Sequence, residues 1–327
     1  MEVYASAFKS ARPAVAVVGA GAMGRALALR FAEAGYPVHA VVSRTRASAE
    51  ALAKAVGAPV ASDRLADLPA SAPLVALCVP DDQIAEVAES LPAVSRPWHG
   101  AVVLHTSGAT PASALDPVRA EGARGLSFHP LQTVTRGASA QTLVGATAGI
   151  EGEAPGVAAG IEIAVGLGMR YLVVSTDAKP RYHLAAAMTS NLLVALMATV
   201  QEVLASIDID RTEAMAILRP LLMGTLDNLA ASSPEDALTG PVKRGDLATL
   251  KAHGLALRKD LPHLVPAYAA LSVEAVRVAV RAGSLSPDRA DAVLALLQRM
   301  VSTPLPPRPD APGDRPAVPS QAWGVGS

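Results

Sequence analysis

The chain has 327 residues, of which 51% are of hydrophobic types and 17% are charged, and its formal net charge at pH 7 is −1. This composition excludes an intrinsically disordered chain, and the balanced charge predicts neither binding to nucleic acid nor attachment to an anionic membrane surface. Cys78 is the single cysteine, so no disulfide can form within the chain, which favours a cytoplasmic location.

The first half of the sequence alternates short apolar runs with helical segments. The expected strands cover 15–18, 38–42, 74–79, 101–104, 125–128 and 170–174, with a looser strand at 148–150, and the expected helices cover 23–34, 47–56, 82–91, 111–121 and 157–167. Such alternation predicts parallel strands joined by crossover helices. Because the runs are continuously apolar, we expect strands that are buried on both faces of a doubly wound α/β sheet.

After Ser175 the pattern becomes helical only, which predicts a second, all-α domain. A long helix is expected from about 179 to 206, and later helices are expected to begin at the capping residues Asp210, Ser233, Asp246 and Ser286. The apolar stretch 184–200 is short and contains polar residues, so we expect a buried helix and no membrane span.

Four segments follow from this division. We predict a flexible N-terminus over 1–12, the α/β domain over 13–175, a helical substrate-binding and dimerisation domain over 176–302, and a disordered proline-rich tail over 303–327.

A glycine-rich sequence, Gly19–Gly24, lies directly after the first strand and opens the first helix. Gly19 permits a tight turn, Gly21 lets the backbone approach a pyrophosphate, and Gly24 lets the helix pack close to the sheet. The phosphates would then lie on free N–H groups at the helix N-terminus, including those of Ala22 and Met23. This position in the chain predicts a Rossmann domain that binds a dinucleotide, although a turn built only for packing would also explain Gly24.

The residues after the second strand favour NADP over NAD. No Asp or Glu stands about 20 residues beyond the glycines, where one would hold the ribose hydroxyls of NAD. The chain instead has Ser43, Arg44, Thr45 and Arg46. A guanidinium matches phosphate oxygens well, so we predict that Ser43 and Arg44 contact a 2′-phosphate. The alternative is that the arginines are solvated loop charges.

Ligands of open α/β sheets bind outside the carboxyl ends of the strands, so residues at the strand ends are candidates. Val79 and Pro80 are expected beside the nicotinamide ribose, and Thr106 and Ser107 beside the nicotinamide or the substrate. His105 and His129 follow the next strands. Each of these two histidines either takes part directly in catalysis or substrate binding or, as is more common, forms hydrogen bonds with backbone groups of its loop. Cys78 lies within an apolar strand and is expected to be inert.

These motifs resemble those of the 6-phosphogluconate dehydrogenase-like superfamily, which includes β-hydroxyacid dehydrogenases and pyrroline-5-carboxylate reductases. The chain is most similar to bacterial predicted oxidoreductases that join a Rossmann-like domain to a helical domain of unknown function. The matching stretches are His105–Ala109, Ser127–Thr133, Tyr182–Leu184, Ser190 with Asn191, Ala237–Pro241 and Arg244–Asp246. The resemblance implies an NAD(P)-dependent oxidoreductase with a helical dimerisation domain.

In the β-hydroxyacid dehydrogenases, the first long helix after the Rossmann domain carries a lysine proton donor and, one turn later, an asparagine. This chain has Ala187 four residues before Asn191, and the nearest substitutes are His183 and Lys179. On a continuous helix His183 lies within about 20° of Ser190 and about 80° of Asn191. We predict that His183 and Asn191 are catalytic with Ser107, and that Ser190 and His129 bind substrate; the alternative is that they are satisfied polar groups in a helix interface.

The string from Thr239 to Asp246 joins a turn to a helix start. Arg244 is expected either to bind a substrate carboxylate or to pair with Asp246 and brace the turn.

The predicted function is hydride transfer between NADP(H) and a small carbonyl or imine substrate in an interdomain cleft of a homodimer. The main alternative is a non-catalytic NADP(H)-binding module. A metal-dependent hydrolase that uses His105, His129 and His183 is a third reading, but we predict no metal site because no carboxylates neighbour these histidines in the sequence.

Overall fold

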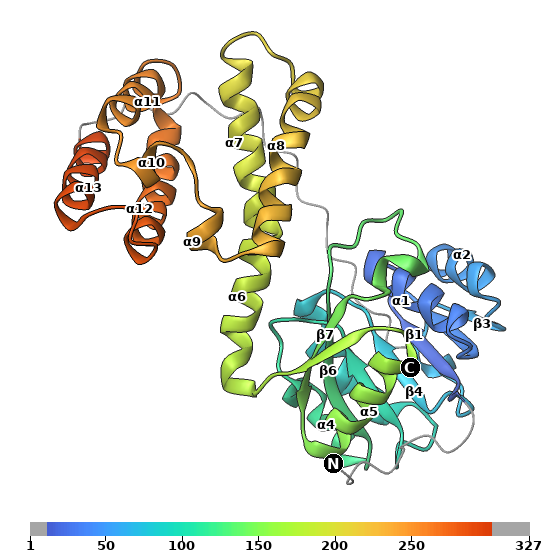
Figure 1. Ribbon diagram of the computed structural model, residues 1–327. Coiled ribbons are helices and arrows are strands. Elements are labelled where there is room, and N and C mark those ends of the chain that lie inside the picture. The colour runs from blue at the N-terminus through green and yellow to red at the C-terminus, as the bar shows by residue number, and fades with distance from the viewer. Residues whose placement is uncertain (1–11, 303–327) are drawn as a thin grey trace. The chain divides into compact units, whose positions relative to one another are not determined.

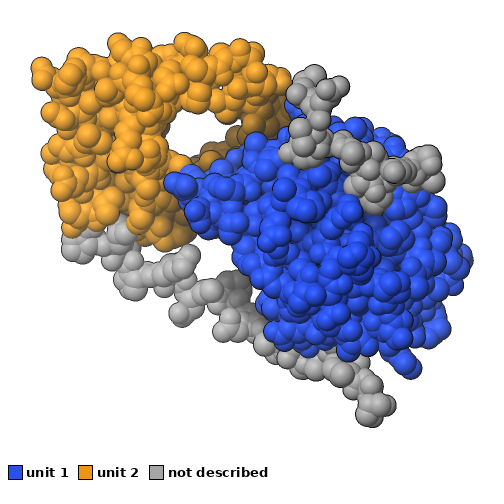
Figure 2. All heavy atoms as spheres, turned by 90° about the horizontal axis from the view of Figure 1, so that it is seen from below, with its two compact units in different colours: residues 1–191, 319–327 blue, residues 192–318 orange. Residues whose placement is uncertain are grey.

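The computed structural model describes residues 12–302 (Figure 1). The predicted flexible N-terminus and proline-rich tail fall almost entirely outside these residues. The chain divides into two compact units between Asn191 and Leu192, which Figure 2 distinguishes by colour. The sequence predicted a boundary after residue 175, where the strands end. The helix that follows packs with the sheet, so the first unit extends further along the chain.

The first unit is built on one eight-stranded sheet in the order β3-β2-β1-β4-β5-β6-β7-β8. Its strands are β1 Val15–Val18, β2 Val38–Val42, β3 Val60–Ser62, β4 Leu74–Leu77, β5 Val102–His105, β6 Arg124–Leu131, β7 Thr147–Gly152 and β8 Arg170–Val173. The order reverses at β1, as in a doubly wound sheet, so the predicted fold class is confirmed.

Three features of the sheet differ from the prediction. The strand β7 runs antiparallel to β6, so the sheet is mostly but not wholly parallel. The short strand β3 was not predicted, because its three residues are too few to show a pattern. The strand β8 is an edge strand whose four residues are all exposed, and so it is not buried on both faces.

Helices cover both faces of the sheet. They are α1 Ala22–Glu33, α2 Arg46–Val56, α3 Ile84–Ser90, α4 Asp116–Ala120 and α5 Ala154–Gly166, followed by α6 Lys179–Thr189. One core packs α1, α2 and α5 against one face, and a second core packs α3 and α4 against the other. Successive side chains of β1 point to opposite faces of the sheet, so Val15 and Val17 pack in the first core and Ala16 and Val18 in the second.

The second unit is helical, as predicted. It contains α7 Asn191–Ala205, of which Asn191 still belongs to the first unit, and then α8 Arg211–Ala231, α9 Pro234–Ala237, α10 Gly240–Arg244, α11 Leu247–Asp260, α12 Val265–Arg281 and α13 Pro287–Ser302. Its core is formed by residues such as Val265, Val276 and Val293 from α12 and α13. The helices α7 and α8 contribute little to it, and Figure 2 shows an opening among the atoms of this unit.

Three predicted caps are confirmed: the side chains of Asp210, Ser233 and Asp246 accept hydrogen bonds from first-turn N–H groups of α8, α9 and α11. The long helix predicted over 179–206 is interrupted. Ser190 has φ −108° and ψ −71°, and this residue separates α6 from α7. The prediction missed the break because neither proline nor glycine marks it.

Two helical segments are long and apolar enough to cross a membrane, Thr176–Ala205 and Pro262–Arg281. Core helices of globular proteins reach the same length and apolar composition. The first segment contains Lys179, which is 2% exposed and donates to Ser127 of β6. The beginning of this segment is therefore packed onto the sheet.

Candidate functional site

The loop between β1 and α1 has the shape that a dinucleotide diphosphate requires. Gly19 has φ +106°, and a Cβ at this position would overlap the carbonyl oxygen of Cys78. A Cβ on Gly24 would overlap the carbonyl oxygen of Gly19, so α1 begins close against the loop. Nothing lies within 4 Å of the place where a Cβ of Gly21 would be, and the backbone there faces open space.

The N-terminus of α1 is open to an anion. Gly21 is the N-cap residue, and no side chain caps this helix. The first N–H groups, including those of Ala22 and Met23, therefore lack a side-chain partner at the positive end of the helix dipole. These residues fit a diphosphate group, as the sequence predicted.

The residues that would choose between NADP and NAD lie at the carboxyl end of β2. Ser43 is buried, whereas Arg44 is exposed. Arg46 is paired with Glu50 at 2.9 Å, one turn further along α2. No ion pair of Arg44 is recorded within residues 12–302, so of the two arginines it is the one whose guanidinium is left for a phosphate.

The end of β4 lies beside the glycine loop. Val79 is buried and Pro80 exposed, and the Val79 backbone nitrogen is 3.1 Å from the position of a Cβ on Gly19. Cys78 is buried, and burial raises the pKa of its thiol to about 12, which keeps the thiol protonated near pH 7. Thr106, at the end of β5, hydrogen-bonds to this thiol.

Ser107 holds the loop after β5 together. Its hydroxyl donates to Asp81 at 2.7 Å and contacts Thr110 Oγ1 at 3.0 Å. The same oxygen accepts from the backbone N–H groups of Ala109 and Thr110. Ser107 is 4% exposed. Its hydroxyl is therefore committed to the loop, and this geometry favours a positioning role for a residue that we predicted to be catalytic.

Both ring nitrogens of His105 contact backbone atoms of its own loop, which is the more common of its two expected roles. Its Nδ1 accepts from the Ser107 N–H at 3.3 Å, and its Nε2 lies 3.3 Å from the carbonyl oxygen of Pro111. Complete burial, assisted by the positive charge of Lys179, lowers the pKa of His105 to about 4. This histidine is therefore neutral at physiological pH.

A buried ion pair lies beneath this loop. The Lys179 ammonium donates to Ser127 Oγ at 2.5 Å and lies 3.6 Å from the Glu151 carboxylate. Glu151 also accepts from the Ala112 N–H at 2.8 Å and the Thr176 hydroxyl at 2.9 Å. Burial lowers the pKa of Lys179, against the attraction of Glu151. The pair ties α6 to β6, β7 and the loop.

His129 and His183 lie beside each other at the end of β6. Their ring centroids are 5.8 Å apart with the planes at 72°. His129 Nδ1 lies 2.9 Å from the Tyr182 hydroxyl. Burial and the neighbouring His183 lower the pKa of His129 to about 4, so this imidazole is neutral near pH 7. His183 Nδ1 is buried and has no hydrogen-bond partner among the described residues.

The other two predicted residues of this helix are placed differently. Ser190 Oγ lies 2.8 Å from the Thr133 hydroxyl, at the break between α6 and α7. Asn191 is exposed at the first position of α7. Because the helix is interrupted, the angles calculated for a continuous helix do not apply. No hydrogen bond from His183 to either residue is recorded in the part of the chain described.

Arg244 belongs to the second unit, in the last turn of α10, and is exposed. Of its two expected roles, the pairing with Asp246 is present only as a longer-range attraction: hydrogen bonds to Thr249 and, less strongly, the charge of Arg244 lower the pKa of Asp246, and no ion pair between the two is recorded within residues 12–302. Asp246 instead caps α11, accepting from the backbone N–H and the hydroxyl of Thr249 at 3.1 and 2.6 Å.

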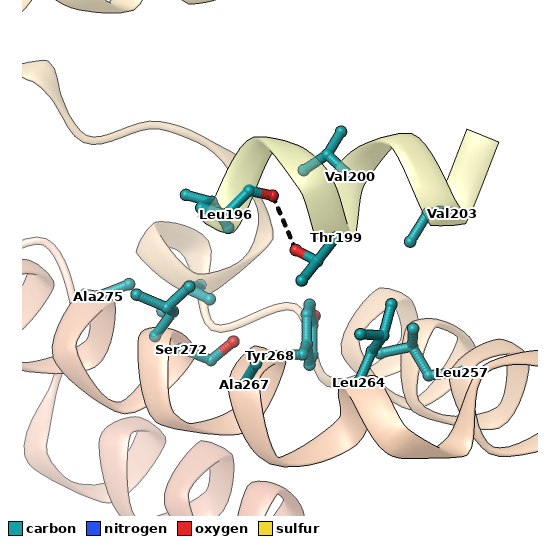
Figure 3. A pocket seen from close by; sticks show the side chains of 12 residues that line it. Leu196, Thr199, Val200, Val203, Leu257, Leu264, Ala267, Tyr268, Ser272 and Ala275 are labelled. Carbon is teal, nitrogen blue, oxygen red and sulfur yellow. Dashed lines mark hydrogen bonds between the residues drawn. The ribbon is translucent and has the colours of Figure 1, made fainter. Parts of the chain in front are cut away.

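A cavity of about 280 Å³ lies in the second unit between α7 and α12 (Figure 3). Apolar side chains such as Leu196, Val203 and Leu264 form most of its wall. The hydroxyl residues Thr199, Tyr268 and Ser272 are the polar ones, and no lining residue is charged. This lining offers no charged group that would pair with a phosphate or a carboxylate. Within residues 12–302, no three His, Cys, Asp or Glu side chains form a group that could hold a metal ion.

Sequence reasoning missed several residues that build the site: Asp81, Gly108, Gly149, Glu151 and Tyr182. Signals were present for three of them: Gly108 and Tyr182 stand in stretches that match the resembling family, and Glu151 is a charged residue inside an otherwise apolar strand, where a charge is buried only with a partner. The others depend on contacts between distant segments, which spacing along the chain does not reveal.

The comparisons with known proteins match this architecture. Residues 2–130 match the family described as Rossmann-like domain, and residues 146–275 match the domain of unknown function DUF2520. The search of curated proteins found no match. A crystal structure from Bacteroides fragilis, provisionally assigned as an NADP oxidoreductase, is 26% identical, covers 81% of this chain and 98% of its own, and has a TM-score of 0.66.

Two further solved structures share the fold. A protein from Thermotoga maritima is 24% identical over 88% of this chain and 98% of its own, with a TM-score of 0.57. The imine reductase from Myxococcus stipitatus in complex with NADP+ is 20% identical over 88% of this chain and 94% of its own, with a TM-score of 0.53. The chain therefore carries a Rossmann-like domain followed by the domain of unknown function DUF2520, as the resemblance in its motifs implied.

Proposed function

We propose that the protein is an NADP-dependent oxidoreductase that transfers a hydride between NADP(H) and a small carbonyl or imine substrate. The observation that carries the proposal is the uncapped N-terminus of α1, which faces open space at Gly21. The structural likeness to the Bacteroides fragilis protein supports this class of activity. The predicted substrate position in an interdomain cleft stays a prediction.

The cofactor would be held by the end of the sheet where the order of strands reverses. The N–H groups after Gly21 would bind the diphosphate, and Arg44 with Ser43 would bind the 2′-phosphate. Val79, Pro80 and Thr106 follow the adjacent strands and would border the nicotinamide half. When bound, the nicotinamide supplies or accepts the hydride.

The chain's own task in the reaction is to bind the substrate and move a proton. His183 would be the proton donor, because its buried Nδ1 has no other partner in the part of the chain described. His129 would bind the reacting group, and Ser107 would hold the loop against which both imidazoles lie. Ser190, Asn191 and Arg244 remain candidates for contacts with the rest of the substrate.

Calorimetry with NADPH and NADH tests the cofactor assignment. The protein should bind NADPH more tightly than NADH, and Arg44→Ala should weaken NADPH binding by about tenfold or more while leaving NADH binding unchanged. Lys54→Ala, which removes an exposed cation from the same helix region, serves as the control and should change neither affinity. Uptake of neither nucleotide by folded protein would overturn the proposal.

Ala187, where the β-hydroxyacid dehydrogenases have lysine, keeps a second function open: a non-catalytic protein whose domains are arranged by bound NADP(H). This alternative predicts tight NADPH binding with no NADPH oxidation for any keto acid, aldehyde or cyclic imine. We favour catalysis because two imidazoles lie beside each other at the end of β6.

We also propose that the protein is a homodimer formed through α7 and α8. The helix α7 has no buried residue, and the one buried residue of α8 is Ala214. Apolar side chains are exposed along both helices. A second copy offers the same apolar surface and would cover it.

A further inference from the structure

The order of the strands places the two halves of a bound dinucleotide on opposite sides of β1. The strand β2 lies on one side of β1, and β4 followed by β5 lie on the other. Neighbouring strands are about 4.8 Å apart, so the ends of β4 and β5 lie about 5 and 10 Å from the end of β1. Because Arg44 at the end of β2 would hold the 2′-phosphate, the nicotinamide half would extend over the ends of β4 and β5.

Backbone hydrogen bonds hold these strand ends at one level. The N–H of Cys78, just after β4, donates to the carbonyl oxygen of Val18 on β1 at 2.6 Å. The N–H of Thr106, just after β5, donates to the carbonyl oxygen of Leu77 on β4 at 3.2 Å. The loops that follow β4 and β5 therefore leave the sheet side by side, next to the glycine-rich loop that follows β1.

Asp81 supplies a carboxylate to this place. It belongs to the loop after β4, is exposed, and accepts a hydrogen bond at Oδ2 from the Ser107 hydroxyl at 2.7 Å. This bond joins the loop after β4 to the loop after β5. Within residues 12–302 no ion pair of Asp81 is recorded, and Ser107 engages one of its two oxygens, so the carboxylate is available to a ligand.

Ser107 fixes the direction of this carboxylate. The Ser107 oxygen accepts from the backbone N–H groups of Ala109 and Thr110 at 3.1 and 2.9 Å. A hydroxyl has two lone pairs and one hydrogen, so the hydrogen is left for Asp81. Because Ser107 is 4% exposed and bonded on every side, it holds Asp81 from below and lies outside the reach of a ligand.

The charged groups around Asp81 do not neutralise it. Burial lowers the pKa of Lys179, and the attraction of Glu151, whose carboxylate lies 3.6 Å from the ammonium, opposes this more strongly than that of Asp81. Asp81 also influences His105 and His129, but burial lowers the pKa of both imidazoles to about 4, so neither is a cation near pH 7. Asp81 is therefore an accessible negative charge where the two loops meet.

We propose that Asp81 faces the nicotinamide end of the bound cofactor and favours its oxidised form over its reduced form, with Ser107 as the residue that positions the carboxylate. The inference deepens the proposed function, on which it rests. The nicotinamide ring is a cation in NADP+ and uncharged in NADPH, whereas the phosphate groups are the same in both. A carboxylate beside the ring therefore attracts the oxidised form selectively.

This selectivity has a consequence for the direction of the reaction. A protein group that binds NADP+ more strongly than NADPH shifts the equilibrium between the two bound forms towards NADP+. Bound NADPH is then a stronger hydride donor than it would be without Asp81. The carboxylate would consequently favour reduction of the substrate.

Calorimetry with three nucleotides tests Asp81. Asp81→Asn removes the charge but keeps the shape of the side chain, so it should weaken NADP+ binding relative to NADPH binding by about threefold to tenfold. Binding of adenosine 2′,5′-bisphosphate, which lacks the nicotinamide half, should not change. Asp82→Asn is the matched control, because Asp82 is exposed in the same turn but is not the residue bonded to Ser107. An unchanged ratio in Asp81→Asn, or an equal change in Asp82→Asn, would overturn the inference.

A double-mutant cycle tests the role of Ser107. Ser107→Ala should change the ratio of NADP+ to NADPH affinity in the same direction as Asp81→Asn, because the carboxylate loses the bond that directs it. A general disturbance of the loop would weaken both forms equally and leave this ratio unchanged. Ser107→Ala added to Asp81→Asn should cause no further change in the ratio. Additive effects, or no effect of Ser107→Ala, would show that Ser107 does not act through Asp81.

Salt supplies a measurement that needs no loss of a loop contact. Contacts to the phosphates weaken equally for both forms as salt is added, whereas the attraction between Asp81 and a cationic ring is screened only for NADP+. The ratio of affinities should therefore decrease more steeply with salt in the unmodified protein than in Asp81→Asn. Equal salt dependence would contradict the inference. Failure to bind either form of the cofactor would instead overturn the proposed function, so the two failures can be told apart.

Discussion

Burial determines the chemistry of the side chains at the strand ends. His105, His129 and Cys78 are all reactive residue types, yet burial raises the pKa of the Cys78 thiol and lowers the pKa of both imidazoles to about 4. His105 uses both nitrogens for its own loop. His129 instead contacts the Tyr182 hydroxyl through Nδ1 and packs against the ring of His183. Residue type suggested the same role for the two histidines, and only their partners separate them.

This burial predicts a loss of stability in acid. A histidine whose folded pKa lies below its unfolded value is protonated first in the unfolded chain. The free energy of unfolding therefore decreases as the pH falls from about 6.5 towards 4, by at most about 1.4 kcal/mol per pH unit for each such histidine, and it is level above that window. Urea unfolding between pH 7.5 and 4.5 measures the slope. His105→Asn should unfold more easily at pH 7.5 but show a shallower slope, and equal slopes would contradict the assignment.

At the level of elements, a buried ion pair and a hydrogen bond of Lys179 attach α6 to the sheet. Lys179 in its first turn reaches Ser127 of β6 and Glu151 of β7. Both side chains of the ion pair are nearly inaccessible, at 3% and 4% exposure. Such a pair gives little net stability compared with apolar residues, but breaking it leaves a buried charge without its partner. The pair therefore fixes where α6 begins, and with it the position of Tyr182 and His183.

Substitution of Lys179 alone should consequently lower the free energy of unfolding more than simultaneous substitution of Lys179 and Glu151. Lys179→Met should lower the free energy of unfolding by about 3–5 kcal/mol, because the Glu151 carboxylate remains buried. The double variant Lys179→Met/Glu151→Gln should recover part of this loss. Urea unfolding at pH 7 measures both, with the exposed Lys54→Met as the control. A single variant as stable as the unmodified protein, or a double variant that recovers nothing, would show that the pair has no such role.

The sequence predicted the elements better than their connections. Apolar runs and glycine spacing identified the strands around the nucleotide loop, because a parallel strand is buried on both faces and has a clear pattern. The reversal of β7 was not visible, since pairing direction depends on the path of the chain between strands. For the site, His129 and His183 were predicted from their type and position. Tyr182 and Gly149 were not, because their roles come from a contact between β7 and α6.

At the level of the whole molecule, the least explained surface is the one on α7 and α8. Leu221 is 70% exposed and Val194 is 68% exposed. Glu202 is the one charged residue in α7, so this helix does not have the polar face of an ordinary surface helix. The cores of the second unit lie in α10 to α13 and do not use these side chains. This surface has the composition of the interior of an oligomer.

A change on this surface should dissociate the proposed homodimer. In a two-fold dimer each substitution occurs twice at the interface, and each buried leucine contributes roughly 1.5–3 kcal/mol. Leu221→Glu should therefore weaken association by at least about 100-fold, and Val194→Glu should act in the same direction. Light scattering at micromolar concentration should give twice the chain mass for the unmodified protein and the chain mass for the variants. Leu255→Glu is the matched control, because Leu255 is 60% exposed but belongs to α11 and not to α7 or α8, and its variant should stay dimeric. A monomeric unmodified protein would contradict the dimer and would leave these apolar helices to contact some other molecule.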